Sequence, residues 1–152
     1  MADIHARHDH IGHAWPAFEV LVERTMALNF ARGLDETRPV YLERDAAVAA
    51  GFRDVLTLPT FPIAMSTERV DLIFAMLELL RLDPARILHA SQRFVHHQPI
   101  CVGDLLTGRK RVVSIADRKG GALTFVDTVI EYRDAAGALV CEDHCSLVHR
   151  NP

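Results

Sequence analysis

The sequence predicts an α+β fold in which an antiparallel sheet wraps around a central hydrophobic helix. Residues 70–80, "VDLIFAMLELL", form the most apolar segment of the chain and contain only two charged side chains. From residue 87 onward, apolar and polar residues alternate with the period of a β-strand. An antiparallel sheet that buries one face needs a cover, and the apolar helix supplies it.

Length and composition favour one globular domain over residues 1–152. Hydrophobic residues make up 49% and charged residues 24% of the chain, an ordinary balance for a folded domain that argues against disorder. A net charge of -3 argues against a chain-wide nucleic-acid surface, so we expect no nucleic-acid partner.

Cysteine usage and the first residues predict a cytoplasmic protein. The three cysteines are odd in number, and "MADIHARHDHIGHAW" is polar where a secretory signal would be apolar. The apolar segment at residues 70–80 is far shorter than the roughly 20 residues that span a bilayer. We therefore expect no membrane partner.

The first half of the chain carries the signals of one short strand and several helices. Residues 18–22, "FEVLV", suit a short strand. Residues 23–34 place apolar side chains at helical spacing, and Gly33 helps to end this helix. Residues 44–52 are rich in alanine and end near Gly51, which suits a second, shorter helix.

The central helix is expected over residues 70–82 and is bounded by Pro84. Its charged side chains fall on one narrow stripe, so we expect burial on most sides. Two starting points fit the sequence. Thr60 can cap a helix that begins at Phe61, or Ser66 can cap a shorter one.

Four strand-like runs fill the second half, separated by short segments that contain turn residues. Gly120, Gly121 and Gly137 supply the positive backbone angles that tight hairpin turns require. Long strands joined mostly by tight turns predict an antiparallel sheet. The four runs are residues 87–97, 105–115, 122–133 and 138–150.

The N-terminal histidines invite a metal-site interpretation, which we do not favour. No cysteine or carboxylate pattern of a structural site accompanies them, and they lie at a chain end. We expect no metal site here. The histidines are His5, His8, His10 and His13.

The motif "CEDHC" resembles a metal or redox site at first sight. On a strand, Cys141, Asp143 and Cys145 face one side while Glu142 and His144 face the other, so the five cannot converge on one ion. We expect small, buried cysteines without chemistry of their own.

Two basic groups and a histidine pair remain as binding candidates. Residues 108–111, "GRKR", and 117–121, "DRKGG", can receive a phosphate, although solvated strand and hairpin charges explain them as well. His96 and His97 point to opposite faces of a strand, so only one is expected to face a pocket. We take His97 as the pocket candidate.

Several segments in order resemble the hot-dog fold of MaoC-like hydratases and dehydratases, in particular the N-terminal FAS1-like dehydratase type. The resemblance covers nearly the whole chain after about residue 11. No single motif is specific, but the succession is. The segments are "IGHAWPAFEVLVERTMALNFARG", "RPVYLERDAAVAAGFRDVLTLPTF", "ILHASQRFVHHQPICVGD" and the final "SLVHR".

The resemblance implies (R)-specific hydration or dehydration of an acyl thioester in fatty acid metabolism. Water is added across, or eliminated from, the 2,3 bond of an acyl group on coenzyme A or a carrier protein. Active members resemble the pattern G-D-x-N-P-[LI]-H, whose Asp and His manage the water and the alpha proton. The thioester is the substrate, and no metal or redox cofactor is implied.

Aligning that pattern through Pro39 shows that the acid–base pair has changed. Glu36 takes the Asp position and Tyr41 takes the His position, while Arg38 takes the Asn position. A phenol with a reference pKa of about 10 is a poor base at neutral pH. A one-residue gap would bring Asp35 to the acidic position, but no gap restores a histidine.

Some dehydratases of this family resemble heterodimers in which one hot-dog chain is catalytic and the other shapes the acyl channel. This chain resembles the second kind, which implies a dimer, either with itself or with a catalytic MaoC-like subunit. No catalytic residue is then expected. The implied substrate-binding residues are Tyr41, Phe52, Thr60, where the family has a helix-head glycine, Phe61 and His97.

Three other functions remain open. In the first, the chain is an active hydratase or dehydratase of an unusual acyl-CoA and uses Glu36 or Asp35 with Tyr41. In the second, it is a hot-dog thioesterase in which a carboxylate activates water. The third is a binding module for acyl thioesters that has no catalytic partner.

Overall fold

The computed structural model describes residues 4–152, with side chains from Arg7 onward. Along the chain, a short strand is followed by the α-helices and then by four long strands, in the order predicted. The strands are β1 (Phe18–Leu21), β2 (Ile87–His96), β3 (Leu105–Arg118), β4 (Leu123–Arg133) and β5 (Leu139–Arg150). The α-helices are α1 (Arg24–Gly33), α2 (Arg44–Ala49), α3 (Pro62–Thr67) and α4 (Val70–Leu79). Short 3-10 helices cover Ile4–His10, Pro39–Tyr41, Pro84–Arg86 and Lys119–Gly121.

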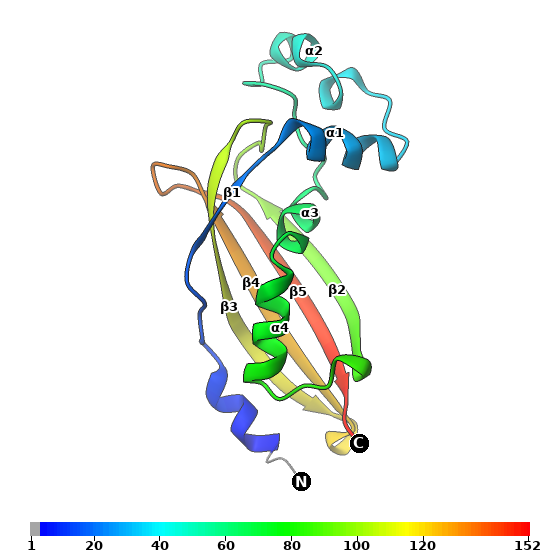
Figure 1. The fold of residues 1–152 in the computed structure, drawn as a ribbon, viewed down its shortest axis with the longest axis vertical. Coiled ribbons are helices and arrows are strands. Elements are labelled where there is room, and N and C mark those ends of the chain that lie inside the picture. Colours follow the sequence, from blue (N-terminus) through cyan, green and yellow to red (C-terminus); the bar gives the residue numbers. More distant parts are fainter. Residues whose placement is uncertain (1–3) are drawn as a thin grey trace.

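All five strands pair antiparallel in one sheet of order β1-β3-β4-β5-β2. Figure 1 shows α3 and α4 running along one face of this sheet, with α1 and α2 beyond one of its ends. Gly120, Gly121 and Gly137 have φ values of 64°, 91° and 82°, which confirms the prediction for the hairpin turns. The predicted α+β class is likewise confirmed.

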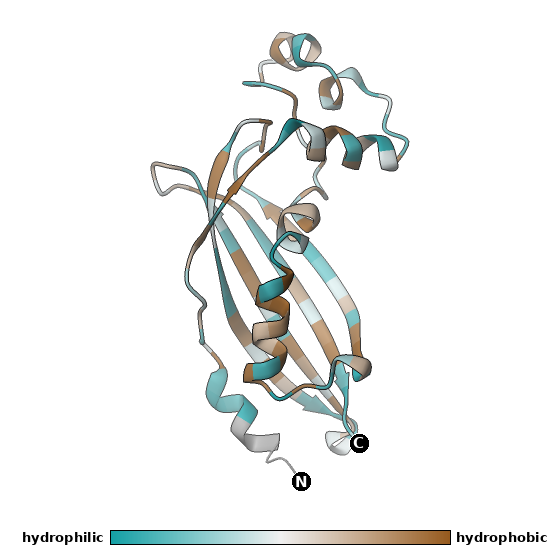
Figure 2. Cartoon of the chain, in the orientation of Figure 1, coloured by the Kyte–Doolittle hydropathy of each residue, from teal (hydrophilic) through white to brown (hydrophobic). Residues whose placement is uncertain are grey.

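Core packing follows from alternation along the strands and from the apolar side of α4. Leu72, Met76 and Leu77 of α4 are buried against inward-facing strand residues such as Leu106 and Val126. Figure 2 shows hydrophobic residues along α4 and at intervals along the strands behind it. Apolar burial of this kind is the main stabilising contribution to the fold.

The central helix is broken into two pieces, and both proposed caps are wrong. Phe61 precedes α3 without a side-chain cap, and Arg69 occupies the junction with α4 in a non-helical conformation (φ -105°, ψ 47°). The Ser66 and Thr67 hydroxyls donate to the carbonyl oxygens of Ile63 and Ala64 at 3.0 and 2.9 Å. Such local bonds compete with the helical ladder, which suits a break at this point.

One side of α4 and one edge of the sheet are open in the single chain. Val70 and Phe74 are 51% and 59% exposed, so α4 is buried on fewer sides than its sequence predicts. Among residues 4–152, strand β2 pairs only with β5, and its other edge has no strand partner. Within residues 4–152, no helix has the combined length and apolarity needed to cross a bilayer.

Gly108 provides a testable packing constraint where β1 meets β3. It lies opposite Phe18 in the register, and an added Cβ would stand 2.5 Å from the Phe18 Cζ. Phe18 is held by an edge contact with Tyr132 and by the Arg69 guanidinium 4.4 Å from its ring centroid. We expect Gly108→Ala to lower the free energy of unfolding by about 1–3 kcal/mol in urea denaturation, because overpacking displaces Phe18. Adding Phe18→Leu should recover part of the loss, and an unchanged midpoint would contradict the constraint.

Candidate functional site

The loop between α1 and α2 folds back on α1 through backbone hydrogen bonds. Asp35 adopts a left-handed conformation with φ of 53°, and its backbone N-H donates to the Arg32 carbonyl at 3.0 Å. The Glu36 N-H donates to the Ala31 carbonyl at 3.0 Å, so the chain folds back on the end of α1. Pro39 then opens a 3-10 turn, where its fixed φ is well suited. Backbone hydrogen bonds to the end of α1 thus fix the start of this loop.

Within this loop the Glu36 carboxylate is fully engaged by its neighbours. Its Oε1 accepts from the backbone N-H groups of Thr37 and Arg38 at 2.9 and 2.8 Å, and from Arg38 Nε at 3.0 Å. Arg38 Nη2 donates to Oε2 at 2.6 Å. The Arg38 side-chain hydrogen bonds, with those from the backbone, lower the pKa of Glu36 to about 2. A carboxylate held this way is poorly suited to proton transfer at neutral pH.

Arg38 also occupies the space beside Tyr41. Its guanidinium carbon lies 4.7 Å from the centroid of the half-buried Tyr41 ring, a cation–π contact. The positions that would carry acid and base therefore hold one clamped carboxylate and one phenol, with a cation between them. Asp35 is exposed at the turn.

A cavity of about 400 Å³ lies where the segment after α2 approaches the end of β2. Two of the predicted substrate-binding residues, Phe52 and His97, line it. Thr60, which follows the lining residue Pro59 in the sequence, is exposed. Phe61 is fully buried, and its ring centroid lies 5.6 Å from that of Phe30. Tyr41, Thr60 and Phe61 are absent from the lining, which consists of Phe52, Leu56, Thr57, Pro59, His96, His97, Gln98, Pro99 and Ile100.

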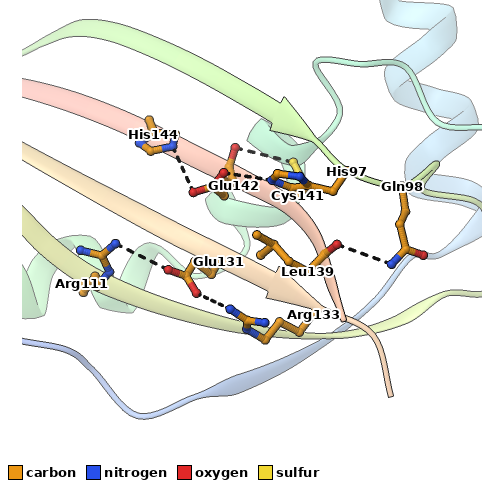
Figure 3. Close-up of polar contacts among 9 residues, drawn as sticks. All are labelled: His97, Gln98, Arg111, Glu131, Arg133, Leu139, Cys141, Glu142 and His144. Atoms are coloured by element: carbon orange, nitrogen blue, oxygen red, sulfur yellow. Dashed lines mark hydrogen bonds and ion pairs between the residues drawn. The ribbon is translucent and has the colours of Figure 1, made fainter. Parts of the chain in front are cut away.

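Both histidines of the pair contribute to this cavity, rather than one. His96 Nε2 donates to the Pro59 carbonyl at 2.8 Å on the helix side of the sheet. His97 lies 3.0 Å from Glu142 on the outer face, where Glu142 also contacts His144 at 3.6 Å (Figure 3). The two side chains point to opposite faces, as the alternation predicts, but β2 ends at His96, and the cavity at this strand end is lined from both faces.

A second cavity, here called the helix–sheet cavity, lies between α3 and α4 and the inner face of the sheet. Its volume is about 300 Å³. This cavity was not among the predicted sites. It is lined by Ile63, Ser66, Thr67, Arg69, Leu72, Ile73, Ile87, His89, Gln92, Lys110, Thr128, Ile130, Asp143, Cys145 and Leu147.

Two buried charged residues line the helix–sheet cavity. Asp143 and Lys110 are 2% and 6% exposed. Gln92 Nε2 donates to Asp143 Oδ1, and Gln92 Oε1 lies 2.9 Å from His89 Nε2. Asp143 Oδ2 has no hydrogen-bond partner among the described residues. Burial raises the pKa of Asp143 to about 6, against the opposing effect of the Gln92 hydrogen bond, and burial lowers the pKa of Lys110.

The family assignment comes from comparison with known proteins. Residues 9–143 match the family described as "FAS1-like, dehydratase domain region". The chain belongs to this family. A UPF0336 protein of Saccharopolyspora erythraea is 35% identical over 135 residues, covering 89% of this chain and 83% of the relative.

Solved structures agree with the assignment to the FAS1-like dehydratase family. The C-terminally truncated HadBC (3R-hydroxyacyl-ACP dehydratase) complex from Mycobacterium tuberculosis contains a similar chain, with a TM-score of 0.77 and 27% identity. The match covers 92% of this chain and 97% of that one. A MaoC-like dehydratase gives a TM-score of 0.80 at 23% identity over 95% of this chain and 43% of its own. The predicted hot-dog fold is confirmed.

Thiols in this FAS1-like dehydratase domain are poorly suited to nucleophilic or redox chemistry. Cys141, Asp143 and Cys145 occupy the inner face of β5, while Glu142 and His144 occupy the outer face, as their spacing predicts. Burial raises the pKa of Cys141 to about 12 and that of Cys145 to about 11, so both thiols stay protonated at neutral pH.

The N-terminal histidines of the domain are engaged in packing and pairing. His8 lies 3.0 Å from Asp117, and His13 packs edge-on against Trp15. The side chain of His5 lies outside the described part of the chain. Among the described residues, no three His, Cys, Asp or Glu side chains gather closely enough to hold a metal ion.

The "GRKR" group does not form one basic surface. Lys110 is buried on the inner face, whereas Arg109 and Arg111 are exposed on the outer face. Arg111 and Arg133 flank Glu131 at 3.5 and 2.9 Å, as Figure 3 shows. Arg118 and Lys119 of "DRKGG" are exposed at the β3–β4 turn.

Proposed function

We propose that this chain is the substrate-binding, non-catalytic subunit of an (R)-specific hydratase or dehydratase that acts on acyl thioesters. The observation that carries the proposal is the Glu36–Arg38 clamp. At the place of the family's catalytic acid, both carboxylate oxygens accept hydrogen bonds from Arg38. Tyr41 stands in place of the histidine beneath the same guanidinium. Neither group is free to take a proton from the alpha carbon or to activate water.

A second hot-dog chain would supply the missing acid and base. The open edge of β2 and the exposed Val70 and Phe74 of α4 offer surfaces for such a partner, because edge strands and apolar helix faces are the usual sites of association. The similar chain from Mycobacterium tuberculosis is part of a 3R-hydroxyacyl-ACP dehydratase complex. A heterodimer with a catalytic MaoC-like chain is the form that we propose.

The proposed subunit binds the acyl thioester and needs no metal or redox cofactor of its own. Hydration adds the elements of water across the 2,3 bond, and dehydration removes them, so only protons and hydroxide move. Phe52 and His97 line the cavity at the end of β2, where they are placed to contact the substrate. The thioester carrier is coenzyme A or an acyl carrier protein.

Turnover of crotonyl-CoA by the lone chain and by a complex tests this proposal. The second chain is a co-expressed hot-dog protein that retains the Asp and His of the family pattern. We expect no turnover above the buffer rate from the purified lone chain and measurable hydration from the complex. Glu36→Ala should leave the rate of the complex within about twofold, as should the control Glu43→Ala at the exposed start of α2.

Other outcomes would contradict the proposal in distinct ways. Turnover by the lone chain that Glu36→Ala abolishes would make this chain an active hydratase. Release of free thiol from acyl-CoA would make it a thioesterase. Tight acyl-CoA binding without turnover, combined with failure to assemble with any catalytic hot-dog chain, would make it a binding module.

A further inference from the structure

Lys110 and Asp143 are buried in one row of the sheet without pairing with each other. The register aligns Lys110 of β3 with Ile130 of β4, and Ile130 with Asp143 of β5. Neighbouring strands lie about 4.8 Å apart, so the two Cα atoms are roughly 10 Å apart, with Ile130 between them. Neither residue takes part in an ion pair within the described chain, and the Lys110 ammonium lies 5.8 Å from the centroid of the Trp15 ring, a cation–π contact.

One carboxylate oxygen of Asp143 accepts a hydrogen bond, and the other has no partner among the described residues. Gln92 donates to Oδ1, and His89 in turn contacts Gln92. The Ser66 hydroxyl lies close enough to Asp143 to lower the pKa of its carboxyl, but it donates its hydrogen to the Ile63 carbonyl at 3.0 Å. Oδ2 of Asp143 therefore has no hydrogen-bond partner among the described residues. Buried polar atoms are nearly always hydrogen-bonded, and an exception inside a cavity indicates a missing partner.

The rest of the helix–sheet cavity is largely apolar. Ile63, Leu72 and Ile73 line it from the helices, and Ile87, Ile130 and Leu147 line it from the sheet. His89 and Thr67, which also line it, are exposed, so the cavity reaches the surface between β2 and α3. Such a cavity suits an elongated apolar group that carries one polar substituent at depth.

We propose that the helix–sheet cavity binds an acyl chain that carries a hydroxyl group, which donates to Asp143 Oδ2 and accepts from Lys110 Nζ. The proposal rests on the function proposed above, in which this chain binds acyl thioesters. It adds the substrate class, namely acyl groups that carry a hydroxyl group on a carbon distant from the thioester.

A hydroxyl fits better than the alternatives because it is both donor and acceptor. An unsubstituted chain would leave Asp143 Oδ2 without a hydrogen-bond partner and Lys110 Nζ with its contact to the Trp15 ring, 5.8 Å from the centroid, in place of a hydrogen bond. A carboxylate would bring a second negative charge beside Asp143, and an ammonium would bring a second positive charge beside Lys110. Because burial raises the pKa of Asp143 only to about 6, its carboxylate is mostly ionised at neutral pH and can accept the hydroxyl hydrogen.

Calorimetric titration of the full chain with matched acyl-CoA pairs tests the proposal. The probes are hexanoyl-, octanoyl- and decanoyl-CoA, each with its ω-hydroxy counterpart. We expect the hydroxylated member to bind roughly tenfold more tightly at one or more lengths. Asp143→Asn, which replaces the acceptor by a donor, and Lys110→Met should each reduce the preference to less than about twofold. Glu131→Gln, which removes a carboxylate from the outer face, should retain it.

The possible failures separate the two proposals. If unsubstituted acyl-CoA binds and no length shows a hydroxyl preference, the hydroxyl site is wrong while acyl-thioester binding stands. A preference that survives in both Asp143→Asn and Lys110→Met overturns the site as well, as does tighter binding of the ω-carboxy thioesters. If none of the acyl-CoA probes binds, both proposals fail. Melting curves of each variant establish that it is folded.

Discussion

Replacing Asp143 by asparagine is expected to raise the free energy of unfolding at neutral pH by about 2 kcal/mol. In the folded chain, burial raises the pKa of Asp143 from 3.8 to about 6. Two pKa units correspond to about 3 kcal/mol of preference for the protonated form. Asparagine has no proton to lose, and we allow about 1 kcal/mol for its amide, which takes the place of an unpaired oxygen.

The pH dependence follows from the direction of the shift. As pH rises from about 4 to about 6, the unfolded chain releases the Asp143 proton while the folded chain still holds it. The unfolded state therefore binds fewer protons, and the contribution of Asp143 to stability falls across this window. Urea denaturation at a series of pH values should show the free energy of unfolding of Asp143→Asn rising relative to that of the wild type across this window.

Glu131→Gln is the matched control for this measurement, because it removes a carboxylate from the outer face of the adjacent strand. The hydrogen bond from Arg133 lowers the pKa of Glu131, so Glu131→Gln should not gain stability relative to the wild type between about pH 4 and 6. A difference in stability between the wild type and Asp143→Asn that stays constant through the window would mean that Asp143 is solvated in solution. The hydroxyl site would then lose its buried acceptor.

The fold was predictable because its signals are local. Alternation along residues 87–150 and the glycines at the turns depend on side-chain period and backbone freedom, and the sheet follows from them. The break between α3 and α4 was not predicted. It depends on Ser66 and Thr67 bonding back to the preceding turn, a conformation that the sequence permits without requiring it.

The candidate site was only partly predictable. The alignment through Pro39 identified the altered acid and base positions, but the Arg38 clamp depends on side-chain geometry. A signal for the helix–sheet cavity was present and overlooked. Lys110 follows Leu106 and Gly108 at period two and therefore occupies a core-facing position, as Asp143 does between Cys141 and Cys145. Charged residues at core positions of two strands indicate a buried polar site.

Replacing Phe61 by alanine is expected to lower the free energy of unfolding by about 3–5 kcal/mol. Phe61 has no exposed surface, and its ring packs edge-on against Phe30 of α1 at 5.6 Å between centroids. It immediately precedes α3, so the same side chain joins α1 to the first turn of the central helix. Removing a buried aromatic ring loses its transfer free energy and leaves a cavity that the surroundings fill only partly.

Phe52→Ala provides the matched comparison, because Phe52 is half-buried and lines the cavity at the end of β2. Its truncation should cost less stability, about 1–2 kcal/mol, and should change acyl-CoA affinity in calorimetric titration. The resemblance assigns both phenylalanines to the acyl channel, whereas the structure separates them into a core residue and a cavity residue. If Phe61→Ala costs no more stability than Phe52→Ala and alters affinity to the same extent, the Phe61 ring faces open space in solution. The acyl channel would then pass between α1 and α3.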